Sequence, residues 1–154
     1  MPGIIFAELM KDVIEKNISF RFTALGFSML PFIHDGDVIT VAPVFHTNLR
    51  IGDVVAFINP ICNQLAVHRI LLISQSGYLI KGDNTNQPDG QVLASNIIGR
   101  VIQVEHCGKN VGIGIGVERI AIAWLSFHGL LKPNIWKVWR FIRPIVKLLD
   151  YKKK

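Results

Sequence analysis

Residues 52–84, GDVVAFINPICNQLAVHRILLISQSGYLIKGDN, decide the fold class of this chain. The stretch contains three short runs of mostly β-branched and aliphatic residues, at 54–58, 65–73 and 78–81. A cluster of turn-forming residues at 59–63 separates the first two runs, and no helical pattern lies between consecutive runs. Runs of this length and composition predict β-strands, and the missing helices argue against β–α–β units.

Similar runs flank this stretch on both sides. VITV at 38–41 precedes it and IIGRVIQV at 97–104 follows it, so strand-like sequence extends over about residues 20–106. The whole chain has 154 residues, enough for one domain with its own core. We therefore predict a mainly β fold whose core is a coiled, barrel-like sheet.

Amphipathic helices are expected on both sides of the sheet. Over residues 4–16 the charged side chains fall on one side of a helical wheel and the apolar ones on the other. The apolar side consists of Ile5, Phe6, Leu9, Met10, Val13 and Ile14. Because the polar face has both signs of charge, we expect this helix to pack on the domain rather than anchor it in a membrane. The domain boundaries predicted are 1–19 for this helix, 20–110 for the β-rich domain and 111–154 for a helical tail.

The tail differs from the rest of the chain in charge. Residues 117–154 contain nine Lys or Arg and two acidic residues, whereas the preceding residues have a net charge of −1. Helical periodicity runs from 117 to 131, stops at Pro133 and resumes over 134–149 with a basic and an apolar face. This pattern predicts a helix lying on an anionic membrane surface; an ordinary docking helix is the alternative. Nucleic-acid binding is not expected, because the basic charge is confined to the tail.

Composition excludes several other classes. Half of the residues are hydrophobic and mean hydropathy is +0.38, so the chain is not intrinsically disordered. No run of 18 apolar residues predicts a spanning helix, and charges in the first thirty residues break any secretory signal. Cys62 and Cys107 form no metal-binding spacing, and we expect two buried, reduced thiols rather than a disulfide.

Three segments supply a hydroxyl, an imidazole and two carboxylates. Ser28 follows Gly26, a residue that permits close backbone approach. His68 lies within the longest strand-like run, and Asp83 and Asp89 lie in the turn-rich loop after the next strand. These side chains are the parts of a nucleophile, a general base and a group that orients the base. Taken alone, Ser28 has the structural alternative of an ordinary turn residue. The structural alternative for His68 is a half-buried histidine without a catalytic role.

The surroundings of these residues form six boxes in a fixed order. The boxes are Gly26–Pro31, Gly36–Asp37, Gly52–Phe57, Val67–Ile70, Lys81–Asn84 and Ile98–Val101. Together they resemble the ordered boxes of type I signal peptidases, in a wider group that includes the self-cleaving LexA-like repressors. The resemblance covers nearly all of the strand-rich part of the chain.

Position 68 distinguishes two branches of this group. Bacterial-type signal peptidases and LexA-like proteins place a lysine base in this box, whereas the endoplasmic-reticulum and archaeal-type branch places a histidine, as here. The resemblance implies that Ser28 is the nucleophile and His68 the general base. Asp83 and Asp89 match the two acidic positions of the last catalytic box. We favour Asp89 as the residue that orients His68 and Asp83 as a support of the loop, with the reverse order left open.

The function implied is that of a serine endopeptidase that cleaves signal or leader peptides from precursor proteins and needs no cofactor. Substrates are expected to bind as an extended strand beside the active-site strands. Relatives usually have a spanning helix before the serine, whereas this chain has only the amphipathic segment at 4–16. We therefore expect a membrane-associated protein, on an undetermined face of the membrane, and allow for a partner subunit that anchors it.

Two rival functions are considered. A LexA-like self-cleaving protein is disfavoured because His68 stands in place of lysine and only 25 residues precede Gly26. A catalytically silent peptide- or membrane-binding module would retain the same scaffold. A metal site is not predicted, because His34, His46, His106 and His128 lie far apart in the sequence.

Overall fold

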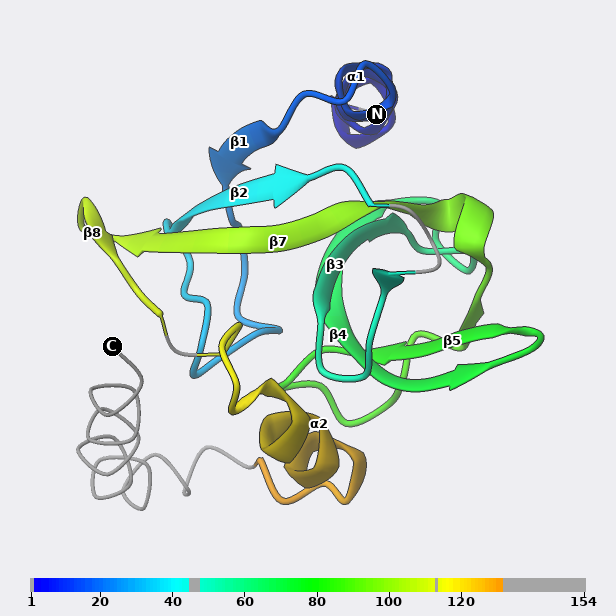
Figure 1. The fold of residues 1–154 in the computed structure, drawn as a ribbon, viewed down its shortest axis with the longest axis vertical. Helices are drawn as coiled ribbons and strands as arrows, with labels where there is room; N and C mark the ends of the chain where they lie inside the picture. Colours follow the sequence, from blue (N-terminus) through cyan, green and yellow to red (C-terminus); the bar gives the residue numbers. More distant parts are fainter. Residues whose placement is uncertain (1, 45–47, 113, 132–154) are drawn as a thin grey trace.

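One antiparallel sheet forms the centre of the protein, with a helix at each end (Figure 1). The computed structural model describes residues 2–44, 48–112 and 114–131. Its elements are, in chain order, α1 (Pro2–Glu15), β1 (Phe20–Thr23), β2 (Val38–Ala42), β3 (Val54–Ile58), β4 (Leu65–Ser74), β5 (Gly77–Lys81), β6 (Gln91–Val92), a short 3₁₀ helix (Ala94–Asn96), β7 (Ile97–His106), β8 (Lys109–Asn110) and α2 (Arg119–Phe127).

The strands follow the order β1-β2-β7-β3-β4-β5-β6, and β8 pairs with β7. The sheet curls strongly around β3 and β4 (Figure 1). The predicted mainly β fold with a coiled sheet is thereby confirmed. The strands β1, β6 and β8 were not predicted individually, because two to four residues are too few to show a clear alternation of polar and apolar side chains.

The hydrophobic core is divided between the two faces of β3. Val54 and Ala56 belong to one buried cluster, and the alternating residues Val55 and Phe57 belong to the other. This division follows from the period of two residues in a strand. Since both faces of β3 are covered, the strand consists of apolar residues without alternation. The neighbouring β4 pairs with β3 over residues 65–69, and this paired part contains His68.

The helix α1 packs against the sheet through its C-terminal half. Met10 is fully buried and Ile14 is 8% exposed, and both join the cluster on one face of β3. Packing on the domain is thus observed for these two residues, whereas Leu9, expected on the same face, is exposed. Asn17, with a φ of 61°, ends the helix by a turn in which its N–H donates to the Ile14 carbonyl.

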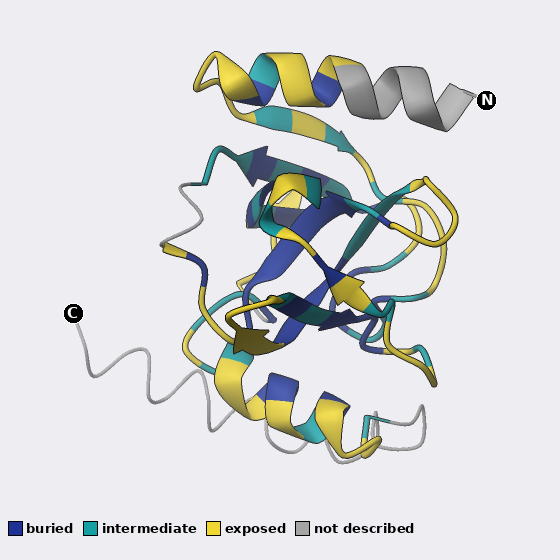
Figure 2. Ribbon diagram, turned by 90° about the vertical axis from the view of Figure 1, so that its right-hand side faces the viewer, coloured by how far each residue is buried: buried dark blue, intermediate teal, exposed yellow. Residues whose placement is uncertain are grey.

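The helix α2 lies at the opposite end of the sheet from α1 (Figure 2). Ile122, Ala123 and Ser126 are its buried residues. The helix ends at Phe127 rather than at the expected residue 131, because Gly129 adopts a φ of 67° that breaks the helical path. The second predicted segment, 134–149, lies outside the described residues.

Both cysteines are unpaired and exposed, so the expected burial was wrong. Cys62 lies in the connection between β3 and β4, and Cys107 lies in the turn after β7 with a φ of 49°. Their positions in turns, not their apolar character, determine their exposure. Among the described residues, no helix has the length and apolar character needed to cross a membrane.

Candidate active site

His68 lies in the middle of β4, opposite Val55 of β3 in the antiparallel register. His68 is 8% exposed, and the centroid of its ring lies 5.9 Å from that of Phe57. A central strand and an aromatic neighbour restrict the rotation of the imidazole. The ring therefore has a fixed orientation in which each nitrogen faces one polar group.

The two nitrogens of His68 connect Ser28 with Asp89. Nε2 lies 2.9 Å from Ser28 Oγ, and Nδ1 lies 2.6 Å from Asp89 Oδ2. The three side chains come from three separate segments: the loop before β2, the strand β4 and the loop after β5. The structure thus brings together three of the four site residues named from the sequence, and it places Asp89, not Asp83, against the imidazole.

Asp89 is positioned by its backbone and by a second side chain. Its N–H donates to the Ile80 carbonyl at 2.9 Å, which fixes the loop against the end of β5. The amide Nδ2 of Asn59 donates to Asp89 Oδ1 at 2.9 Å, so each carboxylate oxygen has a partner. Asn59 itself is held in a turn, where its Oδ1 accepts hydrogen bonds from the N–H groups of Ile61 and Cys62. Sequence reasoning missed Asn59, although it belongs to the turn cluster at 59–63.

The Ser28 loop is fixed to the loop that follows β5. The N–H of Asn84 donates to the Ser28 carbonyl at 2.7 Å, and Nδ2 of Asn84 donates to the Phe27 carbonyl at 3.0 Å. Gly26 adopts a φ of +92° and has open space around its Cα. The glycine therefore serves the turn through its backbone conformation, not through the close approach expected from the sequence.

Close approach is instead required at Gly82. A Cβ at this position would lie 2.7 Å from the Ser28 carbonyl oxygen and 3.0 Å from His68 Nε2. Glycine thus allows the loop after β5 to pass directly over the serine–histidine contact. The Lys81–Asn84 box was recognised from the sequence for its acid, whereas its glycine and asparagine position the serine loop.

Asp83 belongs to a different and more deeply buried group. Its carboxylate forms hydrogen bonds of 2.6 to 3.2 Å with Arg69, and both side chains are fully buried. Arg69 also donates to the carbonyl groups of Gly52 and Gly114 and lies over the ring of Phe32 at 5.5 Å. This network ties the loop after β5 to β4 through Arg69, and Asp83 makes no hydrogen bond to His68.

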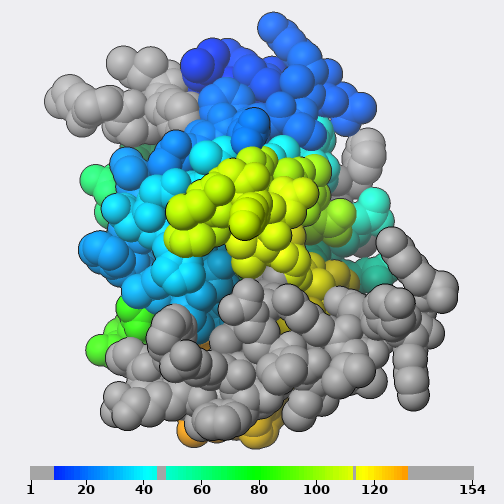
Figure 3. Space-filling view, turned by 90° about the vertical axis from the view of Figure 1, so that its left-hand side faces the viewer, coloured from blue at the N-terminus to red at the C-terminus, as the bar shows by residue number. Residues whose placement is uncertain are grey.

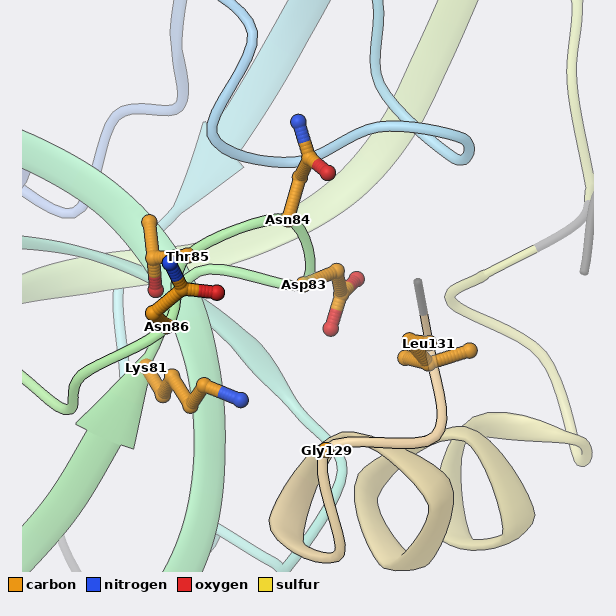
Figure 4. A pocket seen from close by; sticks show the side chains of 7 residues that line it. All are labelled: Lys81, Asp83, Asn84, Thr85, Asn86, Gly129 and Leu131. Atoms are coloured by element: carbon orange, nitrogen blue, oxygen red, sulfur yellow. The ribbon is translucent and has the colours of Figure 1, made fainter. Parts of the chain in front are cut away.

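Lys81, next to this network, faces α2. Its Nζ donates to the Ser126 carbonyl at 2.8 Å, and Figure 4 shows it beside the same hollow as Asp83, Gly129 and Leu131. Burial lowers the pKa of Lys81, while the Asp83 carboxylate acts in the opposite direction. The Lys81 ammonium group thus binds the backbone of α2. The side chain that contacts the Ser28 hydroxyl is His68.

The arrangement can activate a hydroxyl for attack on a carbonyl carbon. An ionised Asp89 only accepts hydrogen bonds, so Nδ1 of His68 donates to it and Nε2 is left free to accept the Ser28 proton. Within the described part of the chain, no hydrogen bond engages the Ser28 N–H. This N–H is therefore available to stabilise the negative charge that develops on the attacked oxygen.

A hydroxyl, an imidazole and a carboxylate in one hydrogen-bonded chain, on a curled antiparallel sheet, define the class of serine peptidases. Comparison with protein families agrees with this class: the family described as Peptidase S24-like matches residues 6–102, and the chain belongs to it. A search of curated protein sequences finds no match. The chain is thus a serine peptidase of the S24/S26 kind, the group that contains both the signal peptidases and the LexA-like proteins of the sequence analysis.

Proposed function

We propose that this protein is an endopeptidase of the signal-peptidase type, with a histidine base, that cleaves leader peptides from precursor proteins. The observation that supports it best is the contact of Ser28 Oγ with His68 Nε2, backed by Asp89. In this proposal Ser28 attacks the peptide carbonyl and forms an acyl-enzyme. His68 transfers the Ser28 proton to the leaving amine, and water then hydrolyses the ester.

The surface next to the site favours an apolar, extended substrate. Leu25 and Phe27, just before Ser28, are 86% and 65% exposed. On the other side of the site Ile61 is 79% exposed, and its Cδ1 lies close to Gly90, the neighbour of Asp89. Apolar side chains on both sides of a nucleophile suit the hydrophobic segment of a leader peptide.

The proposed function is tested with a synthetic leader-peptide substrate supplied in anionic vesicles. Wild type should cleave it, and the rate should be lost in acid, because a protonated imidazole cannot act as a general base. Ser28→Ala and His68→Ala should abolish cleavage while the proteins remain folded. Ser95→Ala, which changes an exposed serine of the short 3₁₀ helix, is the matched control and should retain full activity.

The same assay separates the proposal from its rivals. A LexA-like protein would cut its own chain, at a first-order rate that does not depend on protein concentration, and would leave the added peptide intact. A silent binding module would bind the peptide equally well as wild type and as Ser28→Ala, without cleavage by either. Full activity of Ser28→Ala would show that the nucleophile is assigned to the wrong residue.

We further propose that the protein works at an anionic membrane surface. The exposed side of α2 and the residues around it support this location, because large apolar side chains recur there at helical spacing: Val117, Ile120, Trp124, Phe127 and Leu130. The sequence that follows contains eight Lys or Arg residues between 132 and 154. An apolar stripe next to basic residues is typical of interfacial attachment.

A further inference from the structure

Two histidines that lie far apart in the sequence face one buried carboxylate at the end of β7. His106 Nδ1 lies 2.5 Å from Asp37 Oδ1, and His34 Nδ1 lies 3.6 Å from Asp37 Oδ2. The ligand atoms that the three side chains offer all lie within 4.8 Å of one another. We propose that His34, Asp37 and His106 bind one divalent transition-metal ion of the zinc class.

The fold creates this cluster through the register of two strands. Val38 of β2 pairs with Glu105 of β7, so the preceding Asp37 lies beside the following His106. Figure 3 shows this end of β7, with β8, lying against the segment before β2. Distance along the chain is the reason that the sequence predicted no metal site here: the histidines are separated by 72 positions but meet across one strand pair.

The carboxylate is held in place before any ion binds. Asp37 is 2% exposed, and its Oδ2 accepts the backbone N–H of His34 at 2.8 Å. The Asp37 N–H in turn donates to the His34 carbonyl at 3.1 Å, which closes a tight turn around Gly36. One ligand is thus rigid, and a backbone donor orients it in the way that outer-shell groups orient metal ligands.

The two imidazoles are free to adjust around that fixed ligand. The side chains of His34 and His106 are 41% and 52% exposed, with ring centroids 5.3 Å apart. Zinc binds imidazole nitrogen and carboxylate oxygen at about 2.0–2.2 Å, so small ring rotations are enough to bring both Nδ1 atoms to one ion. Two nitrogens and one oxygen suit zinc, copper or nickel, whereas magnesium and calcium prefer oxygen ligands.

The site would be linked to the active-site loop through the backbone. The Ala24 N–H donates to the Asp37 carbonyl at 2.7 Å, and the Gly26 N–H donates to Asp35 Oδ1 at 2.7 Å. The turn that supplies two of the ligands thus also holds the segment that leads to Ser28. Metal binding is nevertheless independent of the proposed peptidase activity, and it is measured without a substrate.

The test is a titration of the full-length, untagged protein with Zn²⁺, and separately with Co²⁺, after removal of bound metal by a chelator. We expect one equivalent to bind, with the intense visible absorption of four-coordinate Co²⁺, and the thermal midpoint of unfolding to rise with Zn²⁺ concentration. His106→Ala removes a direct ligand and should weaken binding by at least the roughly 10- to 100-fold that loss of an outer-shell partner costs. His128→Ala, which removes an exposed histidine outside the cluster, should bind as wild type does.

Further variants exclude other ligands in the chain. Binding should persist in His68→Ala, which removes the other histidine–aspartate pair, and in Cys62→Ser with Cys107→Ser, which removes both thiols. Because the His106 side chain is 52% exposed, its replacement disturbs the fold less than that of the buried Asp37, so the proposal stays testable even if Asp37→Asn unfolds. The absence of stoichiometric Zn²⁺ binding, equal binding by His106→Ala, or Mg²⁺ binding of similar strength would each overturn the proposal and leave a simple His106–Asp37 ion pair.

Discussion

Asn59 is the residue whose role is seen only in three dimensions. Its Nδ2 donates to the Asp89 oxygen that does not face His68, so it fixes the rotation of the carboxylate. A hydrogen bond to a charged group contributes about 1.5–3 kcal/mol, which corresponds to roughly 10- to 100-fold in rate if the loss appears in the transition state. We therefore expect Asn59→Asp, which keeps the turn-forming oxygen but loses the donor, to reduce kcat by this amount.

The pH profile shows whether Asn59 acts through Asp89. A carboxylate at position 59 would add negative charge near His68, so the rising limb of the activity profile should move to higher pH in Asn59→Asp. Asn86→Ala, in the exposed loop after β5, is the matched control and should keep the wild-type profile. An Asn59→Asp enzyme with unchanged kcat and profile would show that the hydrogen bond to Asp89 has no positioning role.

A second prediction concerns the close contact between Gly82 and the Ser28 loop. An added Cβ would meet the Ser28 carbonyl oxygen at 2.7 Å and must push the serine loop away from His68. We expect Gly82→Ala to lose at least tenfold in kcat/KM while its circular dichroism stays that of wild type, because small displacements of reacting groups are costly. Gly112→Ala adds the same methyl group in open space and should be fully active. Equal activity of the two variants would argue against this tight contact.

At the scale of elements, the buried pair of Arg69 and Asp83 joins β4 to the loop after β5. Both side chains are fully buried, and Arg69 also binds two carbonyl groups from other segments. Removal of one partner from such a pair leaves an uncompensated buried charge and costs about 3–5 kcal/mol. Asp83→Asn should therefore lower the free energy of unfolding in urea by about that amount. Asp35→Asn, in the exposed turn before β2, is expected to cost far less.

Lys81 connects β5 to α2 by a hydrogen bond. Its lowered pKa determines how the free energy of unfolding changes with pH. Between that lowered value and the ordinary lysine pKa of about 10.4, the unfolded chain binds more protons than the folded chain. In this alkaline window the Lys81 contribution therefore makes the free energy of unfolding rise with pH. Urea unfolding from pH 8 to 10 should show a steeper rise for wild type than for Lys81→Met. Lys109→Met, on the exposed β8, should behave as wild type does, and equal slopes for wild type and Lys81→Met would contradict the argument.

The long strands could be predicted from the sequence, and the contacts between them could not. The apolar runs at 54–58 and 65–73 match β3 and β4 closely, and in β3 the continuous apolar pattern follows from burial on both faces. The Ser28, His68 and Asp89 positions were named through ordered motifs, and their roles stay predictions. Asn59 and the His34–His106 contact were missed, because a hydrogen bond across loops and a strand register leave no periodic signal in the chain.

At the scale of the whole molecule, the two helices differ in what they leave exposed. Among its described side chains, α1 exposes one large apolar residue, Leu9, whereas α2 exposes Ile120, Trp124 and Phe127. In the sequence, the basic residues are concentrated after residue 116, in α2 and the residues that follow it. We therefore expect the proposed membrane attachment to involve the exposed apolar side of α2.

Binding to vesicles tests whether the exposed apolar side chains of α2 attach the protein to a membrane. We expect wild type to bind anionic vesicles and to show a blue shift of tryptophan fluorescence. Replacement of Ile120 and Trp124 together by serine should weaken binding by more than tenfold, because each large apolar side chain contributes at least about 1.4 kcal/mol when it leaves water. Ile102→Ser removes one exposed apolar side chain from β7, outside α2, and should bind as wild type does. Unchanged binding of the double variant would mean that charge alone attaches the protein, and 1 M salt would then release it completely.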